Sequence, residues 1–232
     1  MEIKILHVYH DLLDLYGDFF NIKFIQQKIQ EMGYVCNIYK KSISDDIDFT
    51  EYDVTYMGHG KASCLVPAVE HLIKNQESFK KAVELEKVFL IVGNSRFLLG
   101  EKFETWNGEV TQGIGLFNYQ GKENKSVYTT DVISSPVFDE SIKVYGFINR
   151  TGELINNDTY PLFSVEKGKL LGQNEGNLYK NLIATWQLGP ILVRNPSFTK
   201  NILQRILNKN YKSVSFALEE KAYALTICEF WN

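Results

Sequence analysis

Cysteine and histidine are scarce in this sequence, and their scarcity excludes several classes of protein. The 232 residues include only three cysteines and four histidines, namely Cys36, Cys64, Cys228, His7, His10, His59 and His71. Three scattered cysteines form neither a disulfide framework nor a Cys-rich zinc module. His7 and His10 lie three residues apart, which matches no recognised metal-binding spacing. We therefore expect no metal and no cofactor.

An excess of positive charge and long apolar runs are also lacking. The formal net charge is -3, so the chain offers no global attraction to nucleic acid or to anionic lipid. No segment approaches the roughly 18–20 apolar residues of a membrane span. The opening segment is interrupted by His7, His10 and Asp11 and does not resemble a signal peptide. We expect a cytoplasmic protein with no nucleic-acid or membrane partner.

Internal repeats, low-complexity segments and Pro/Gly linkers are absent, which predicts a single domain over residues 1–232. Within it, β-rich and helical patterns alternate over segments 3–9, 21–32, 34–39, 52–57, 63–81 and 88–92. The segment 88–92 is wholly apolar, as is typical of a central parallel strand buried on both faces. This alternation predicts an α/β fold with a mainly parallel, doubly wound sheet flanked by helices.

The second half of the chain has a different pattern. Short β-like runs at 114–119, 126–133 and 142–147 predict antiparallel additions to the sheet. Residues 182–186 are expected to add a further strand, and helices are predicted over 199–207 and 214–230. In the last helix, Leu218, Ala222 and Leu225 share helical spacing, so we expect that side to pack on the body of the protein.

Two glycine-containing turns follow predicted strands, and ligands of open α/β sheets bind at such strand ends. One is Gly58-His59-Gly60, and the other is Gly93-Asn94-Ser95, with a helix expected from Arg96. Glycines there allow backbone N–H groups to approach a ligand, as in an oxyanion hole, or simply form tight turns. Neither turn has the pattern of a phosphate loop.

Several segments, in order along the chain, resemble class I glutamine amidotransferases of the cobyric acid synthase type. Within this family the chain resembles the glutaminase subunits of lipid II isoglutaminyl synthase. The opening LYGDFFNI resembles the family's N-x-Y-G-D-x-G-N. The turn GHG corresponds to its G-G-G-Q-D, VYGFIN to V-x-G-F-E-N, and GPILVRNP to the end of H-G-P-L-L-P-K-N-P. The resemblance covers roughly residues 3–208 and implies the family's fold.

The departures from the family pattern concern its catalytic residues. The family's nucleophile motif C-G-G-[FY]-Q-x-L-G corresponds here to GNSRFLLG, which places Gly93 at the cysteine and Phe97 at the glutamine. The family's general base, the histidine of H-G-P, corresponds to Leu188. Glutamine hydrolysis requires a nucleophile and a nearby base. We therefore assign no catalytic residue, and we place a remodelled pocket at Gly58, His59, Gly60, Asn94, Ser95, Arg96, Phe97 and Asp18.

Two substitutes for the missing pair remain open. Ser95 lies two residues beyond the nucleophile position, where a helix N-cap is the favoured interpretation. Cys64 and His59 would form a rebuilt pair only if the thiol faced the pocket, whereas a helical Cys64 is expected to face the core.

These observations leave two main hypotheses and a third. The favoured one is a catalytically silent subunit that docks on a synthetase or holds a small-molecule ligand in the pocket. The resemblance implies an ATP-dependent, Mur-ligase-like synthetase as that partner. The alternative is an active glutaminase supplying ammonia to such a synthetase, or to a corrinoid synthetase, through a non-standard nucleophile. The third is a purely structural subunit whose pocket is filled by Arg96, Phe97 and Leu188.

Overall fold

A single twisted sheet forms the centre of the protein, and one half of it is parallel. The computed structural model describes residues 1–157 and 159–231. In the parallel half the strands lie in the order β2 (Val35–Lys41), β1 (Glu2–Val8), β3 (Val54–Met57), β4 (Val88–Val92) and β11 (Leu182–Thr185). All five residues of β4 are buried, as the wholly apolar sequence predicts.

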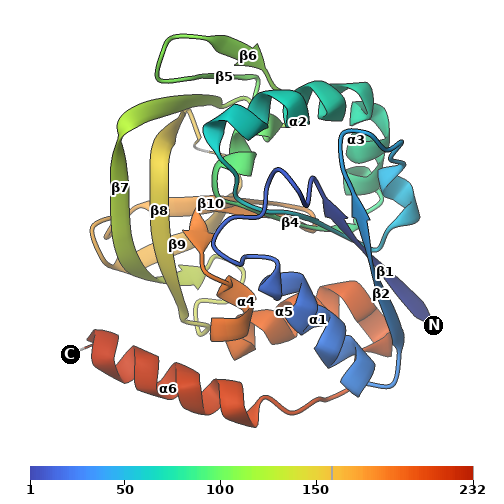
Figure 1. Cartoon of the computed structure of the whole chain (residues 1–232). Helices are drawn as coiled ribbons and strands as arrows, with labels where there is room; N and C mark the ends of the chain where they lie inside the picture. Colours follow the sequence, from blue (N-terminus) through green and yellow to red (C-terminus); the bar gives the residue numbers. More distant parts are fainter. Residues whose placement is uncertain (158, 232) are drawn as a thin grey trace.

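The other half is built mainly from antiparallel pairs that continue from β11. These strands are β10 (Asn174–Tyr179), β9 (Pro161–Lys167), β7 (Gln120–Pro136), β8 (Val144–Ile155) and the two-residue β12 (Gln187–Leu188). The short strands β5 (Lys102–Glu104) and β6 (Val110–Gln112) pair with each other, and β5 also pairs with β7. Figure 1 shows β7 and β8 as long curved strands away from the parallel half. The predicted fold class, a mainly parallel sheet with antiparallel additions, is confirmed.

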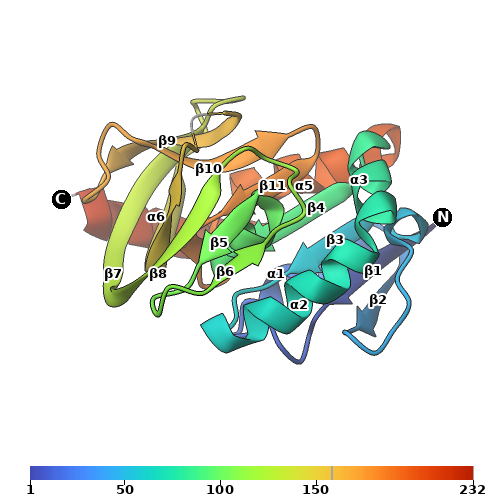
Figure 2. The same ribbon diagram turned by 90° about the horizontal axis from the view of Figure 1, so that it is seen from above.

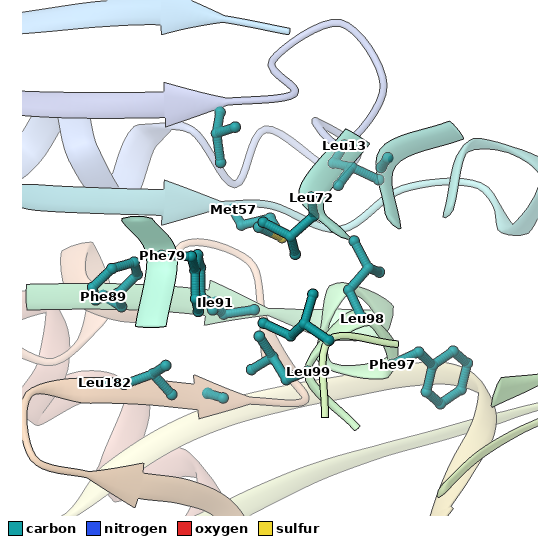
Figure 3. Packing of buried hydrophobic residues seen from close by; sticks show 14 of the residues in the cluster. Leu13, Met57, Leu72, Phe79, Phe89, Ile91, Phe97, Leu98, Leu99 and Leu182 are labelled. Carbon is teal, nitrogen blue, oxygen red and sulfur yellow. The ribbon is translucent and has the colours of Figure 1, made fainter. Parts of the chain in front are cut away.

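Helices cover both faces of the parallel half (Figures 1 and 2). On one face lie α2 (Ala62–Lys74) and α3 (Gln76–Glu84), and on the other lie α1 (Phe20–Glu31), α4 (Ile191–Arg194) and α5 (Pro196–Leu207). Each face has its own apolar core. In the α2–α3 core, Figure 3 shows Leu98 and Leu99 near Met57, whereas Phe97 points away from them. The segment after β4 therefore contributes to this core directly.

The helix expected over 63–81 is two helices. The chain breaks at Asn75, whose backbone ends α2 and precedes α3. Its side-chain Nδ2 donates to the carbonyl of His71 at 3.0 Å. Asparagine side chains compete in this way with the backbone hydrogen bonds of a helix, which explains the interruption.

Two other predictions of local structure are wrong. Residues 114–119 form no strand, because the backbone N–H groups of residues 114–117 bond to the carbonyls of Leu98, Leu99 and Gly100 instead of to a strand partner. No α-helix begins at Arg96, because the 3₁₀ helix η2 (Gly93–Leu99) occupies this segment.

The last helix, α6 (Ala217–Trp231), faces the protein with a different side from the one expected. Leu218 and Leu225 are 81% and 70% exposed. Contact comes instead from Tyr223, whose hydroxyl donates to the carbonyl of Lys143 at 2.7 Å, and from Phe230, whose ring lies 4.8 Å from that of Tyr145. Aromatic groups on one side of the helix therefore attach it, and its leucines face solvent.

Candidate functional site

The turn Gly58-His59-Gly60 follows β3 and packs tightly against the loop after β1. The backbone N–H of Leu15 donates to the His59 carbonyl at 2.9 Å. A Cβ atom on Gly58 would lie 2.3 Å from the carbonyl oxygen of Leu13. A Cβ atom on Gly60 would lie 2.3 Å from the Cδ2 atom of the same leucine. Because no side chain fits at either position, the two glycines allow these backbones to approach.

Gly93 follows β4 and lies directly against His59. Its φ of +67° is in the left-handed region, and a Cβ atom on it would lie 2.1 Å from His59 Nδ1. The next backbone N–H, that of Asn94, donates to the same Nδ1 at 3.1 Å. Burial lowers the pKa of His59 to about 4, so the ring is a neutral acceptor at physiological pH. The imidazole therefore occupies the space that a side chain at position 93 would need, and it accepts a hydrogen bond from the backbone N–H of Asn94.

Asn94 and Ser95 tie the two turns together. The Asn94 side chain accepts from the N–H of Gly60 at 3.0 Å and donates to the carbonyl of the same residue at 2.7 Å. The Ser95 hydroxyl donates to the carbonyl of Gly58. Ser95 is fully buried within η2, so the expectation that it caps a helix is wrong. Of the predicted pocket residues, the structure brings Gly58, His59, Gly60, Asn94 and Ser95 together as one hydrogen-bonded unit.

Leu188 lies in β12, at the position where the resemblance places a general base. Its side chain is buried in the core that also contains Ile191 and Leu192. Next to it, the N–H of Gly189 donates to Asp18 Oδ1 at 2.8 Å. Burial raises the pKa of Asp18 to about 6, although this hydrogen bond opposes the shift. Asp18 thus holds the backbone beside Leu188, and Leu188 itself offers no group for proton transfer.

Arg96 and Phe97 belong to a different part of the molecule. Arg96 is fully buried, with Nη1 3.3 Å from Glu175 Oε1 and Nη2 2.6 Å from Asn177 Oδ1. The ring of Phe97 packs edge-on against Trp186 at 5.5 Å. These two residues therefore connect η2 with strand β10 and the Trp186 segment, away from the unit formed by the two turns.

Glu175 is a buried charge that sequence reasoning missed. Its carboxylate accepts from the N–H of Trp186 at 2.7 Å, from the hydroxyl of Thr185 at 2.6 Å and from Gln187 Nε2 at 3.2 Å, in addition to pairing with Arg96. Glu175 precedes Gly176 in a segment that resembles the family, and this resemblance could have drawn attention to it. No local pattern in the sequence indicates that this glutamate is buried.

Cys64, the other candidate nucleophile, lies in the first turn of α2 and is half-buried against the α2–α3 core. Within residues 1–157 and 159–231, no three His, Cys, Asp or Glu side chains are grouped so that they would hold a metal ion. No helix in this part of the chain has the length and apolar character needed to cross a bilayer.

Fold and site together define a class. A parallel sheet carrying a tight glycine turn after its central strand β4, beside a second glycine turn after β3, defines an open α/β protein with a candidate site at the carboxyl ends of its strands. The chain belongs to the CobB/CobQ-like glutamine amidotransferase domain family, which matches residues 4–196.

Two curated proteins are similar over most of the chain. Subunit GatD of lipid II isoglutaminyl synthase (glutamine-hydrolyzing) from Streptococcus pneumoniae strain R6 is 28% identical, covering 90% of this chain and 82% of that protein. Its counterpart from Staphylococcus aureus strain N315 is 29% identical, covering 94% and 89%. A crystal structure of a glutamine amidotransferase superposes with a TM-score of 0.51 at 12% identity, covering 87% of this chain and 98% of its own. That likeness supports the fold alone.

Proposed function

We propose that this chain is a catalytically silent, glutamine amidotransferase-like subunit that docks on a cytoplasmic, ATP-dependent synthetase. The observation that carries the proposal is the contact between Gly93 and His59. The position of the family's nucleophile has no side chain, and the His59 ring lies where a Cβ atom would be, at 2.1 Å. Glycine supplies no thiolate there, and the His59 ring fills the space in which a nucleophilic side chain would lie.

The remaining catalytic elements are also altered. In oxyanion holes, backbone N–H groups point at the developing negative charge. Here the N–H of Asn94 is bonded to His59 and that of Gly60 is bonded to Asn94. Leu188 replaces the base. The nucleophile, the proton acceptor and two free donors are thus missing together.

The partner half of the proposal rests on similarity. Both curated relatives bear the name of a subunit of a synthase, and each is matched over more than four fifths of its length. We propose that the chain also keeps the surface by which such a subunit docks. We propose a synthetase of this kind as the partner.

The alternative, an active glutaminase with a non-standard nucleophile, would depend on Ser95 or Cys64. The Ser95 hydroxyl is buried and donates to the backbone carbonyl of Gly58, not to a base. Cys64 packs against the apolar core. Neither arrangement resembles an activated nucleophile, in which the hydroxyl or thiol donates to a base.

One experiment tests both halves. The tagged full chain is recovered from the cytosol of its native host, retained proteins are identified, and ammonia release from amide-labelled glutamine is measured on the same sample. The staphylococcal relative, prepared in parallel, sets the scale of activity. We expect a retained synthetase and no ammonia release above the no-protein control.

Glutaminase activity that disappears in Cys64→Ala or Ser95→Ala would overturn catalytic silence. Failure to retain any ATP-dependent synthetase would overturn the docking role and would leave the first conclusion unaffected.

A further inference from the structure

A polar cavity of about 490 Å³ opens beside η2, between strands β8 and β10. Buried residues form its floor, namely Arg96, Glu175, Gly176 and Trp186. Amide and charged side chains form much of its rim, namely Glu153, Asn156, Gln173 and Asn174. Its size is that of a small-molecule site. None of the two-turn residues Gly58, His59, Gly60 and Gly93 lines it, so this cavity is separate from the filled nucleophile position.

The negative charge at the floor is already neutralised. Glu175 pairs with Arg96 and accepts three further hydrogen bonds, so its carboxylate has no need of a cationic ligand. Arg96 uses both terminal nitrogens, on Glu175 and Asn177, but its buried Nε has no acceptor within the described residues. A buried donor without an acceptor is costly, but this Nε is inaccessible from the cavity, so it makes no contact with a ligand there.

Arg150 supplies a second cation on the wall of the cavity, where Glu175 and Glu153 are the acids that act on it. Its guanidinium carbon lies 5.4 Å from the ring centre of Trp186 and 5.2 Å from that of Tyr128. Across the part of the chain that the structure describes, the guanidinium makes no hydrogen bond and no ion pair. Glu153, the other acid at the cavity, is exposed at the rim and forms no ion pair with it. Half-burial between aromatic rings partly removes water from this cation and lowers its pKa.

We propose that this cavity binds a small oxyacid anion, a carboxylate or a phosphate, held by the guanidinium of Arg150 over the Trp186 ring. A guanidinium stacked on an aromatic face has a rigid fork of N–H donors that matches two oxygens of such an anion. The rim amides of Asn156 and Asn174 are suited to polar groups elsewhere on the ligand.

This inference goes beyond the proposed docking role and rests on it only in that the cavity binds a ligand without a reaction. The probes are inorganic phosphate, succinate, and succinamide, which is close in size to succinate but uncharged. Binding to the purified full chain is followed by thermal unfolding and by tryptophan fluorescence, since Trp186 is one of three tryptophans and lies at the site.

The matched variants are Arg150→Gln, Arg150→Lys and Arg194→Gln. Arg194 is an exposed arginine that also lies over an aromatic ring, that of Tyr145 at 5.7 Å, and it does not line the cavity. We expect saturable millimolar or tighter binding of phosphate or succinate, and none of succinamide. Affinity falls about tenfold or more in Arg150→Gln, less in Arg150→Lys, and is unchanged in Arg194→Gln.

Because Arg150 has no hydrogen-bond partner, Arg150→Gln is expected to fold, and its unliganded melting temperature verifies this. Comparison of the affinities for succinate and for phosphate shows whether the site prefers carboxylates or phosphates. Absence of saturable binding to the wild type, or equal binding by Arg150→Gln, would overturn the proposal. Synthetase retention by Arg150→Gln is measured separately, so that loss of the anion site is distinguished from failure of the docking role.

Discussion

At the scale of single residues, Gly93 is the position whose identity the structure explains most fully. We expect Gly93→Ala to destabilise the fold by about 2–4 kcal/mol. The added methyl group overlaps His59 at 2.1 Å, and a φ of +67° is unfavourable for any residue with a Cβ atom. The free energy of unfolding, from urea titration monitored by circular dichroism, measures the loss.

Gly115→Ala is the matched control. Gly115 also has a left-handed backbone, with φ +59°, but nothing lies within 4 Å of where its Cβ atom would be. It should cost only about 1–2 kcal/mol, the backbone contribution alone. If the two substitutions cost the same, the contact with His59 does not restrict position 93. The double variant Gly93→Ala with His59→Ala should recover part of the loss, because it removes the overlapping ring.

At the scale of elements, α6 shows that helical spacing of apolar residues does not by itself identify the packed side. We expect Tyr223→Phe to weaken the attachment of α6 by about 1 kcal/mol, since it removes the hydrogen bond to the Lys143 carbonyl. Hydrogen exchange of the α6 amides should accelerate by a corresponding factor of about five. Leu225→Ala, on the exposed side, should leave the exchange of the α6 amides unchanged. If Leu225→Ala accelerates exchange and Tyr223→Phe does not, the leucine side of α6 is the packed one.

Elements with strong local patterns are the ones that sequence predicts well. The wholly apolar run of β4 and the helical spacing of α1 depend on neighbours in the chain, and both lie where expected. The break at Asn75 depends on one side chain competing for a carbonyl, which periodicity does not register. Residues 114–119 have strand-like composition, but their hydrogen bonds go to the η2 segment.

In the candidate site, too, features that depend on local pattern are predictable from sequence, and features that depend on contacts between distant residues are not. Residues of both glycine turns are predicted from the sequence to share one pocket, and the structure joins the two turns by hydrogen bonds at the edge where β3 and β4 end. The His59 ring fills the space at Gly93, 34 positions further along the chain. Local spacing in the sequence does not predict a contact between residues so far apart. The buried pair of Arg96 and Glu175 is 79 residues apart and equally beyond local pattern.

At the scale of the whole molecule, Glu175 joins the parallel half of the sheet to the antiparallel half. It lies in β10 and binds Arg96 of η2, directly after β4. We expect Glu175→Gln to destabilise the protein by about 3–5 kcal/mol, because it leaves the buried guanidinium of Arg96 uncompensated. The melting temperature and the urea midpoint both measure this change.

The control for Glu175→Gln is Glu84→Gln, which removes the pairing of an exposed carboxylate with Lys180 and should shift the melting temperature far less. A second variant separates charge from packing. Adding Arg96→Met to Glu175→Gln removes the uncompensated cation, so the double variant should be more stable than Glu175→Gln alone. If it is less stable, the arginine contributes mainly through its packing against Trp186, and the link between the halves of the sheet is apolar. If it is more stable, the connection depends on compensating a buried charge, as the geometry indicates.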